Sequence, residues 1–580
     1  MRSVGNRLAR VTILTMAVVL ATGCAGIPGS SPARVADPMP DNAQLPEQLT
    51  RSFAVVNPER GDTPRDTVAK FITAQANPER SHGVARQFLS PRAVDSWEDG
   101  ASVRVIDAAP YVRSASPNNE VAITTHQVGT VADDGSYSPQ EEAYSYTFHL
   151  VRVAGGWRID NPPAGVLVSA ADFKNVYRQY DLYYLDQAEK HVIGDLRYFA
   201  STSTSSSTSM ATLFLRLLQR SPSTALGSAV RSELVGGVRL VGNVAQDDDK
   251  VLRVYFTGLG VKSAPARNAA VAQIVWTLSQ LASTGVQVFD DGQQLDLPGV
   301  SQPTQQSDWQ TFDPDALPVN TGAYYLRDGA LYTMDGARAP GPVGQGDYAL
   351  SSIAVSLTSD SSPAQRLAGV SLRSGQASLY VGQVDGPLTV RLHARTLLAP
   401  TWDNVFDEVW TVRDGRLVRV PRRGQPAPVD AQSLDSLGPV RVLRLSRDGT
   451  RVAVVAGSPS RLYIARVARN NSRVAVENPV NVAPSLPDVE DVSWASATTL
   501  LVLARGEGDD RMLRNVSVDG AVIANETKVG LPGPPVAVAA APNLPSIVRS
   551  DGSLWQRTGD RWTNLIRGRT VEGTAPTYPD

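Results

Sequence analysis

Cysteine and histidine are scarce in this chain, and their scarcity excludes several kinds of chemistry. Among 580 residues there is one cysteine, Cys24, so no internal disulfide and no cysteine-based metal site can form. The five histidines are scattered along the chain, without the His-x3-His or His-Glu-x2-His spacing of zinc sites: His82, His126, His149, His191 and His393. The sequence therefore predicts no metal.

No excess of positive charge is present either. The 55 basic and 57 acidic residues nearly cancel, giving a formal net charge of -2. Nucleic-acid binding depends on clustered positive charge that neutralises phosphates, so we expect no nucleic-acid role. Only six basic residues are lysines, a bias typical of high-GC genomes and suggestive of an actinobacterium.

Linear catalytic motifs are missing as well. The chain has no Gly-x-Ser-x-Gly elbow, no Ser-x-x-Lys with its supporting motifs and no Walker-type Gly-Lys-Ser/Thr loop. The run Asp247-Asp248-Asp249 could bind a cation, but strands flank it and Lys250 follows it, which favours a solvated hairpin tip. We therefore predict that the protein is not an enzyme and that it has no catalytic residues and no cofactor.

The N-terminus has the anatomy of a signal peptide, which we place at residues 1–23. Arg2, Arg7 and Arg10 precede the apolar run 11–21, which ends in small residues. A spanning helix needs roughly 20 apolar residues, so this run is too short to anchor the mature protein.

Cys24 follows that run directly. The sequence Leu20-Ala21-Thr22-Gly23-Cys24 resembles a bacterial lipobox, which implies an S-diacylglycerol and an N-acyl chain, such as palmitate, on Cys24. A lone thiol in an exported protein could only oxidise or mispair, whereas multiple acyl chains give stable attachment. The alternative is a cleaved secretory signal with an incidental thiol.

The length suggests about three or four domains. Residues 24–61, polar and rich in proline, are predicted to be a lipidated tether.

The first folded domain is expected at residues 62–181. Thr63-Pro64-Arg65-Asp66 predicts a helix start, and residues 84–89 predict a second helix that ends before Pro91. Alternating runs at 103–106, 121–128 and 144–151 and a Gly-Gly-Trp-Arg-Ile hairpin follow, an order similar to the NTF2-like cone fold.

A second α+β unit is expected at residues 182–300. The apolar spacing within Asn268–Leu281 predicts an amphipathic helix, and the turn Asp290-Asp291-Gly292 predicts a hairpin that covers its apolar face. A helix at 210–218 and strands at 238–241 and 251–256 precede them. This order resembles the GerM-type domain of sporulation and germination proteins, an exported interaction module.

After a linker at 301–320, residues 321–580 lose the helical period and gain a repeat. A turn followed by an apolar anchor recurs six times, with anchors 48, 38, 45, 51 and 41 residues apart at Leu331, Leu379, Leu417, Leu462, Leu513 and Leu554. Four short strands in roughly 45 residues is the period of a propeller blade, so we predict a β-propeller of about six blades. A β-sandwich is the alternative, but it has no reason to repeat at this interval. The predicted fold class is thus multidomain α+β and all-β.

The order of lipobox, α+β domain, GerM-type domain and propeller resembles the actinobacterial LpqB lipoprotein family over nearly the whole mature chain. The resemblance implies an accessory lipoprotein on the extracytoplasmic face of the cell membrane. It also implies a partner, the ectodomain of an MtrB-like sensor histidine kinase, and modulation of the MtrA–MtrB two-component system, which affects cell-wall homeostasis and division.

Two rivals stay open at this point. Propeller enzymes assemble their sites from separated blades, so a cell-envelope hydrolase or lactonase need not show a linear motif; the pair Trp402-Asp403 is too short to decide. A glycan- or solute-binding lipoprotein would instead use a cone pocket near Trp97 and Trp157. The oligomeric state cannot be read from the sequence.

Overall fold

The computed structural model describes residues 56–116, 119–202, 205–281, 284–358, 365–470, 473–566 and 568–580. The predicted signal peptide, Cys24 and most of the tether lie outside these ranges. Within them, no helix has both the length and the apolar character needed to cross a bilayer.

The cone module, residues 62–181, begins with the predicted helix. α2 (Pro64–Ala74) starts with a reciprocal cap, in which Asp66 N donates to Thr63 Oγ1 at 3.2 Å and Thr63 N donates to Asp66 Oδ2 at 3.1 Å. The second helix was predicted to reach residue 89, but α3 (Glu79–Arg86) ends earlier. Pro91 instead opens α4 (Pro91–Ser96), because proline suits the first turn of a helix and Ser90 caps it.

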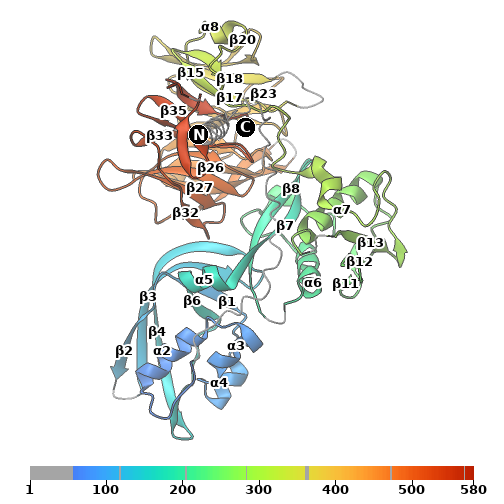
Figure 1. The fold of residues 1–580 in the computed structure, drawn as a ribbon, viewed down its shortest axis with the longest axis vertical. Coiled ribbons are helices and arrows are strands. Elements are labelled where there is room, and N and C mark those ends of the chain that lie inside the picture. The colour runs from blue at the N-terminus through green and yellow to red at the C-terminus, as the bar shows by residue number, and fades with distance from the viewer. Residues whose placement is uncertain are drawn as a thin grey trace, which may run out of the picture. The chain divides into compact units, whose positions relative to one another are not determined.

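One mixed sheet forms the rest of the cone module (Figure 1, blue to cyan). Its order is β5-β4-β3-β1-β6, with β2 also paired to β3. The strands are β1 (Ser102–Ile106), β2 (Tyr111–Ser116), β3 (Glu120–Ala132), β4 (Tyr137–Val153), β5 (Gly156–Ile159) and β6 (Val166–Ser169). α5 (Ala170–Val176) follows. Phe71 of α2 packs edge-on against Phe148 of β4, with ring centroids 6.0 Å apart, so helix and sheet share one core.

In the GerM-type module, the described residues form two sheets and two long helices. The first sheet, β8-β7-β9, comprises β7 (Tyr177–Asp186), β8 (Val192–Ala200) and β9 (Val230–Arg231). The second has the path β10-β12-β13-β14 with β11 beside β12, and comprises β10 (Arg239–Leu240), β11 (Ala245–Gln246), β12 (Leu252–Thr257), β13 (Val286–Asp290) and β14 (Gln293–Gln294). The helices are α6 (Ser207–Leu218) and α7 (Ala264–Leu278), with the 3-10 turns η1 (Gly227–Ala229) and η2 (Gln306–Phe312). The boundary expected between residues 181 and 182 falls inside β7.

The prediction of an amphipathic α7 is wrong, although the helix exists. Every residue from Ala269 to Leu278 is buried, including the polar Gln273 and Thr277. The predicted hairpin forms, with Phe289 opposite Gln294, but it is not the only cover. β7 packs on the helix as well, and Thr277 Oγ1 accepts a hydrogen bond from Tyr183 N at 3.0 Å, so both faces of α7 are occupied.

The described residues of the propeller form six sheets, as the repeat predicts (Figure 1, yellow to red). Blade 1 is β37 (Thr574–Thr577), β15 (Tyr324–Arg327) and β16 (Ala330–Thr333). Blade 2 is β17 (Leu350–Val355), β18 (Arg366–Arg373), β19 (Gln376–Gln383) and β20 (Leu388–Ala394). Blade 3 is β21 (Thr401–Asp403), β22 (Glu408–Arg413), β23 (Arg416–Pro421) and β24 (Ala427–Pro428).

The remaining blades follow the same order. Blade 4 is β25 (Val440–Leu445), β26 (Arg451–Ala456), β27 (Arg461–Asn470) and β28 (Arg473–Asn481). Blade 5 is β29 (Val489–Trp494), β30 (Thr499–Arg505), β31 (Arg511–Ser517) and β32 (Ile523–Asn525). Blade 6 is β33 (Pro535–Ala539), β34 (Ile547–Ser550), β35 (Ser553–Thr558) and β36 (Arg561–Asn564). The short elements α8 (Pro342–Gln345) and η3 (Gln432–Leu437) lie in connections between blades.

The ring closes because the last strand supplies the inner strand of blade 1. β37 pairs antiparallel with β15, with Tyr324 opposite Thr577, and it also contacts the inner strands of blades 2 and 6. Among the described strands, this closure leaves no free inner edge.

The repeated turns of the sequence all join the second and third strands of their blades. Asp328-Gly329, Ser374-Gly375, Asp414-Gly415 and Asp551-Gly552 have positive φ at both residues, the type I′ geometry that suits two-residue hairpins. Since antiparallel strands alternate in direction, these turns share one end of the propeller with the connections between blades, and we call this end the turn face. The opposite end carries the turns between first and second and between third and fourth strands, and we call it the junction face.

Candidate functional site: a polar junction between modules

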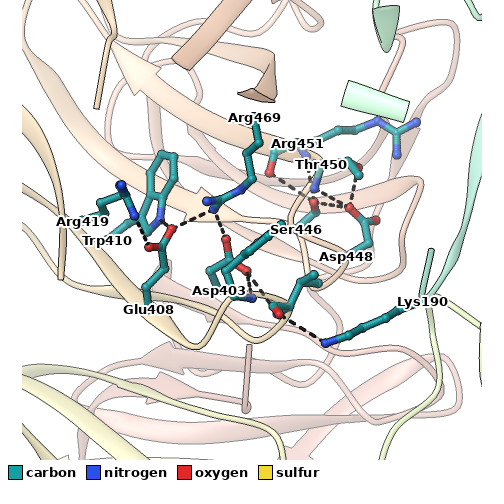
Figure 2. A network of polar contacts seen from close by, with 12 residues as sticks. Lys190, Asp403, Glu408, Trp410, Arg419, Ser446, Asp448, Thr450, Arg451 and Arg469 are labelled. Atoms are coloured by element: carbon teal, nitrogen blue, oxygen red, sulfur yellow. Dashed lines mark hydrogen bonds and ion pairs between the residues drawn. The ribbon is translucent and has the colours of Figure 1, made fainter. Parts of the chain in front are cut away.

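A buried network of charges joins blades 3 and 4 near the junction face (Figure 2). Arg469 of β27 binds the carboxylate of Asp403 and lies 2.8 Å from Glu408 Oε1. Glu408 also accepts from Arg419 Nη1 at 2.9 Å and from Trp410 Nε1 at 3.0 Å. The two carboxylates are 0% and 2% exposed, so the two arginines are their principal compensation.

Burial dominates the electrostatics of Asp403 and raises the pKa of its carboxyl to about 6, while Arg469 acts in the opposite direction. Its Oδ1 accepts from Val405 N and Phe406 N, both at 3.1 Å, and so fixes the turn that follows β21. The Arg469 guanidinium lies over the Phe406 ring at 3.9 Å. The Trp402-Asp403 pair of the sequence therefore has a structural use in this blade.

That turn also receives a contact from the GerM-type module. Lys190 Nζ, in the turn between β7 and β8, donates to Val405 O at 3.3 Å (Figure 2). The charge network within the propeller thus supports a loop that touches another module.

A second turn on the junction face presents Arg451. Asp448 Oδ1 accepts from Ser446 Oγ at 2.7 Å and from Thr450 N at 2.8 Å, which closes the turn between β25 and β26. Arg451, 5% exposed, then donates from Nη2 to Gly194 O of β8 at 2.5 Å. Arg466 Nη1 adds a bond to Thr224 O at 2.8 Å.

The cone module reaches the same junction through Arg197 of β8. This guanidinium is 1% exposed and binds Asp134 of the cone module and Asp195 of its own strand, the latter at 2.6 Å. Asp195 Oδ2 also accepts from Ser223 N at 2.8 Å. On the propeller side, a Cβ on Gly520 would lie 2.9 Å from Pro139 Cγ, so the glycine permits this close approach.

A cavity of about 60 Å³ lies where these groups meet, lined by Tyr137, Asp195, Ser223, Arg451 and Asp519 together with their neighbours. Arg451 Nη1, Ser223 Oγ and Asp519 Oδ2 are buried there without a hydrogen-bond partner in the described part of the chain. Its size and polarity suit a few water molecules.

Asp181 of β7 belongs to the same electrostatic neighbourhood. Burial raises the pKa of its carboxyl to about 7, opposed by the nearby Arg451. The arrangement holds modules together through charge and hydrogen bonds, and several of its carboxyl groups are sensitive to pH.

The structure places the other candidate residues apart from this junction. Trp97 is part of the cone core: its Nε1 donates to Pro163 O at 2.9 Å and its ring lies 5.6 Å from Phe71. Trp157 lies under the Arg152 guanidinium at 4.6 Å. Both tryptophans therefore pack against other side chains of the cone module.

Asp247 serves the hairpin tip that the sequence predicts. Its Oδ1 accepts from Asp249 N and Val251 N, and its Oδ2 lies 3.0 Å from Arg253. Over the described ranges, no group of three or more His, Cys, Asp or Glu side chains is placed to hold a metal ion.

The propeller enzyme rival needs acidic or histidine side chains that converge on the channel mouth. Two acidic residues do lie near Arg444: Asp491 in β29, the inner strand of blade 5, and Asp580 at the end of the chain. Asp491 accepts from Val492 N and Val538 N, and Asp580 accepts from Trp402 N, so backbone amides already engage both carboxylates.

The fold and the junction define a class: a multidomain protein in which a cone module, a GerM-type module and a closed propeller pack as one compact unit over Ser52–Asp580. Comparison with known families agrees with each module. The description "Lipoprotein LpqB, N-terminal domain" matches residues 57–174, "Sporulation and spore germination" matches 181–296, and "Lipoprotein LpqB beta-propeller domain" matches 329–579.

Relatives span the chain as a whole. Lipoprotein LpqB of Mycolicibacterium smegmatis is 32% identical over 77% of this chain and 78% of its own length. Lipoprotein LpqB of Mycobacterium bovis is 29% identical over 99% of this chain and 100% of its own. The chain therefore belongs to the LpqB lipoprotein family.

Similarity to solved structures is much lower. TolB from Acinetobacter baumannii covers 59% of this chain and 83% of its own, at 13% identity and a TM-score of 0.32. The tandem GerMN domains of GerM from Bacillus subtilis cover 27% of this chain and 58% of their own, at 18% identity and a TM-score of 0.18.

The sequence reasoning missed Arg451, Arg469 and Arg197. Each is one arginine among many, and its partner lies on another strand or module. A weak signal did exist: the run Ser446-Arg447-Asp448-Gly449-Thr450 is a typical turn sequence, and it places Arg451 directly after it.

Proposed function

We propose that this chain is an accessory lipoprotein held on the extracytoplasmic face of the cell membrane by acyl chains on Cys24. The proposal is supported by the lipobox-like Leu20–Cys24, by the lone cysteine and by membership of a family whose relatives are named lipoproteins. A diacylglycerol thioether with an N-acyl chain supplies the two or more anchors that stable attachment requires.

Its role would be to bind and modulate the ectodomain of an MtrB-like sensor histidine kinase, and through it a two-component system that affects the cell wall and division. The observation that carries this is the polar junction: Arg451, Arg466 and Arg197 tie three modules into one unit. Such a unit presents surfaces in fixed relation to a partner, and it requires no covalent chemistry. The kinase itself comes from the family resemblance.

The anchor is tested by mass spectrometry of the membrane fraction and by Cys24→Ser. We expect the natural chain to carry acyl groups on Cys24, and the variant to lack them and to signal more weakly. An unmodified mature N-terminus would overturn the lipid anchor. Unchanged signalling by Cys24→Ser with the protein released to the medium would show that tethering is dispensable.

The partner is tested by crosslinking in cells, followed by mild detergent extraction and pull-down. Recovery of a sensor kinase ectodomain is the expected result. A matched sample of Arg451→Met, in which the bond to Gly194 is lost, should recover less of it. Recovery of unrelated proteins alone would contradict the proposal.

A further inference from the structure

The turn face of blades 1 to 3 displays arginines at equivalent positions. Arg327, Arg373 and Arg413 are each the last residue of a second strand, directly before the type I′ turn. All three are exposed, and none of them lies within ion-pairing distance of a carboxylate among the residues that the structure describes. Arg373 donates only to a backbone oxygen, Asp347 O, at 2.7 Å.

Blade 3 adds a like-charge pair. Arg413 lies directly opposite Arg416 across the hairpin, an arrangement that is destabilising unless a negative charge compensates it. Within the described ranges neither arginine forms an ion pair with a carboxylate, and the backbone beside Arg413 is that of Leu397.

Blade 5 also has two arginines opposite each other across its hairpin, and there a glutamate neutralises them. Arg505 lies opposite Arg511, and Glu490 binds both, at 3.0 Å from Arg505 Nη2 and 2.6 Å from Arg511 Nε. The fold can therefore supply a counter-charge at this position. Among the described residues, blade 3 keeps the two cations without a counter-charge, so this hairpin is free to accept a negative charge from outside the blade.

The surroundings of these arginines identify the kind of surface that they fit. Leu372, beside Arg373, is 63% exposed. Exposed acids on the same end of blades 1 to 3 are Asp328, Asp347 and Asp414, and Asp414 already accepts from the backbone amides of Arg395 and Thr396. Among the residues that the structure describes, the contacts given above between the propeller and the other modules lie at the junction face and not at the turn face.

We propose that the turn face of blades 1 to 3 docks on anionic phospholipid headgroups. The arginines are spread over three successive blades and do not converge on a pocket, so the matching negative charge must also be spread over a surface. The exposed Leu372 beside Arg373 suits the boundary between headgroups and acyl chains. This inference rests on the proposed anchor, which would hold the propeller within reach of a bilayer.

The test uses the full acylated chain reconstituted into vesicles of phosphatidylcholine alone or mixed with phosphatidylglycerol. Amide hydrogen exchange is followed at residues 372–376 and 413–416. We expect slower exchange only with phosphatidylglycerol, and loss of this protection as salt rises from about 0.1 M to about 1 M, where the Debye length falls from about 10 Å to about 3 Å.

Substitution of Arg327, Arg373 and Arg413 by glutamine should weaken docking about fivefold for each arginine, roughly a hundredfold together. The matched control is Arg113→Gln with Arg220→Gln and Arg239→Gln, three exposed arginines on other modules, which should leave the protection unchanged.

The outcomes separate the two proposals. If the chain inserts into vesicles but these turns exchange equally in both lipids, the docking surface is wrong and the anchor stands. If the chain carries no acyl group, the anchor is wrong, and cosedimentation of the full chain with the two kinds of vesicle tests the arginines directly. Equal pelleting with both lipids, or protection by an acidic protein and not by phosphatidylglycerol, overturns the inference.

Discussion

Replacing Arg469 by methionine tests whether the buried charges of blades 3 and 4 are balanced as the geometry indicates. In the natural chain, Arg469 and Arg419 face Asp403 and Glu408. Removal of Arg469 leaves Glu408 with Arg419 and leaves Asp403 without a cation. Removing one partner of a buried ion pair destabilises a protein by about 3–5 kcal/mol. At about pH 7.5, the free energy of unfolding of the propeller should therefore fall by roughly 3–5 kcal/mol in the variant.

The loss should depend on pH, in a direction that the structure fixes. The pKa of Asp403 is raised to about 6 from an ordinary value of 3.8, so near pH 5 the side chain is largely neutral and no longer needs Arg469. We therefore expect the effect of Arg469→Met to shrink to about 1–2 kcal/mol near pH 5. For the same reason, Arg469→Met with Asp403→Asn should recover most of the stability at neutral pH.

Thermal unfolding followed by tryptophan fluorescence is a suitable assay, because Trp410 donates to Glu408 within this network. For a domain of this size, a change of about 3–5 kcal/mol lowers Tm by roughly 10 °C. A change below about 1 kcal/mol, or an equal loss at both pH values, would refute the view that Asp403 depends on Arg469 for compensation.

Three further predictions concern the junction. Asp181→Asn should stabilise the protein at neutral pH by about 1–2 kcal/mol, because the buried carboxylate no longer has to lose its hydration. The folded pKa of Asp181, about 7, lies above the ordinary value of 3.8, so the stability of the natural chain should fall as pH rises from about 4 to about 7. Denaturant titration should show a flatter dependence on pH for the variant. Arg197→Met should cost about 3–5 kcal/mol by leaving Asp195 buried without its cation, and unchanged urea unfolding would contradict this. Gly520→Ala should loosen the cone module, seen as faster amide exchange near Pro139, because φ is +78° and the added Cβ would lie 2.3 Å from Val482 O. Gly552→Ala, where φ is +74° and the space is open, is the control and should show only local strain.

Much of the fold was predictable because local patterns encode it. The Thr63 cap requires only residues three positions apart, and the type I′ turns require only an Asp-Gly or Ser-Gly pair between apolar strands. The six repeats of turn and anchor then predict six blades. α4 was missed because Pro91 was interpreted as a stop, although proline begins helices as readily as it ends them.

Other features depend on residues far apart in the sequence. Apolar spacing in Asn268–Leu281 suggested one buried face, but the first sheet of the GerM-type module covers the other, so only packing shows that α7 is buried all round. β8 could not be recognised from alternating apolar and polar residues, because seven of its residues are buried in succession. The closure of blade 1 by β37 likewise pairs strands from the two ends of the propeller.

The sequence by itself determined the modules, their order and the repeat of the propeller, since caps, turns and hydrophobic periods act over a few residues. It also singled out Cys24, which stays a prediction because it lies outside the described residues. The tertiary structure alone decided which charges meet: Arg451 reaches Gly194 across 257 positions of the chain. Glu490 neutralises one arginine pair, whereas Arg413 and Arg416 have no carboxylate partner among the described residues. Electrostatic partners are chosen by distance in space, and no local pattern records that distance.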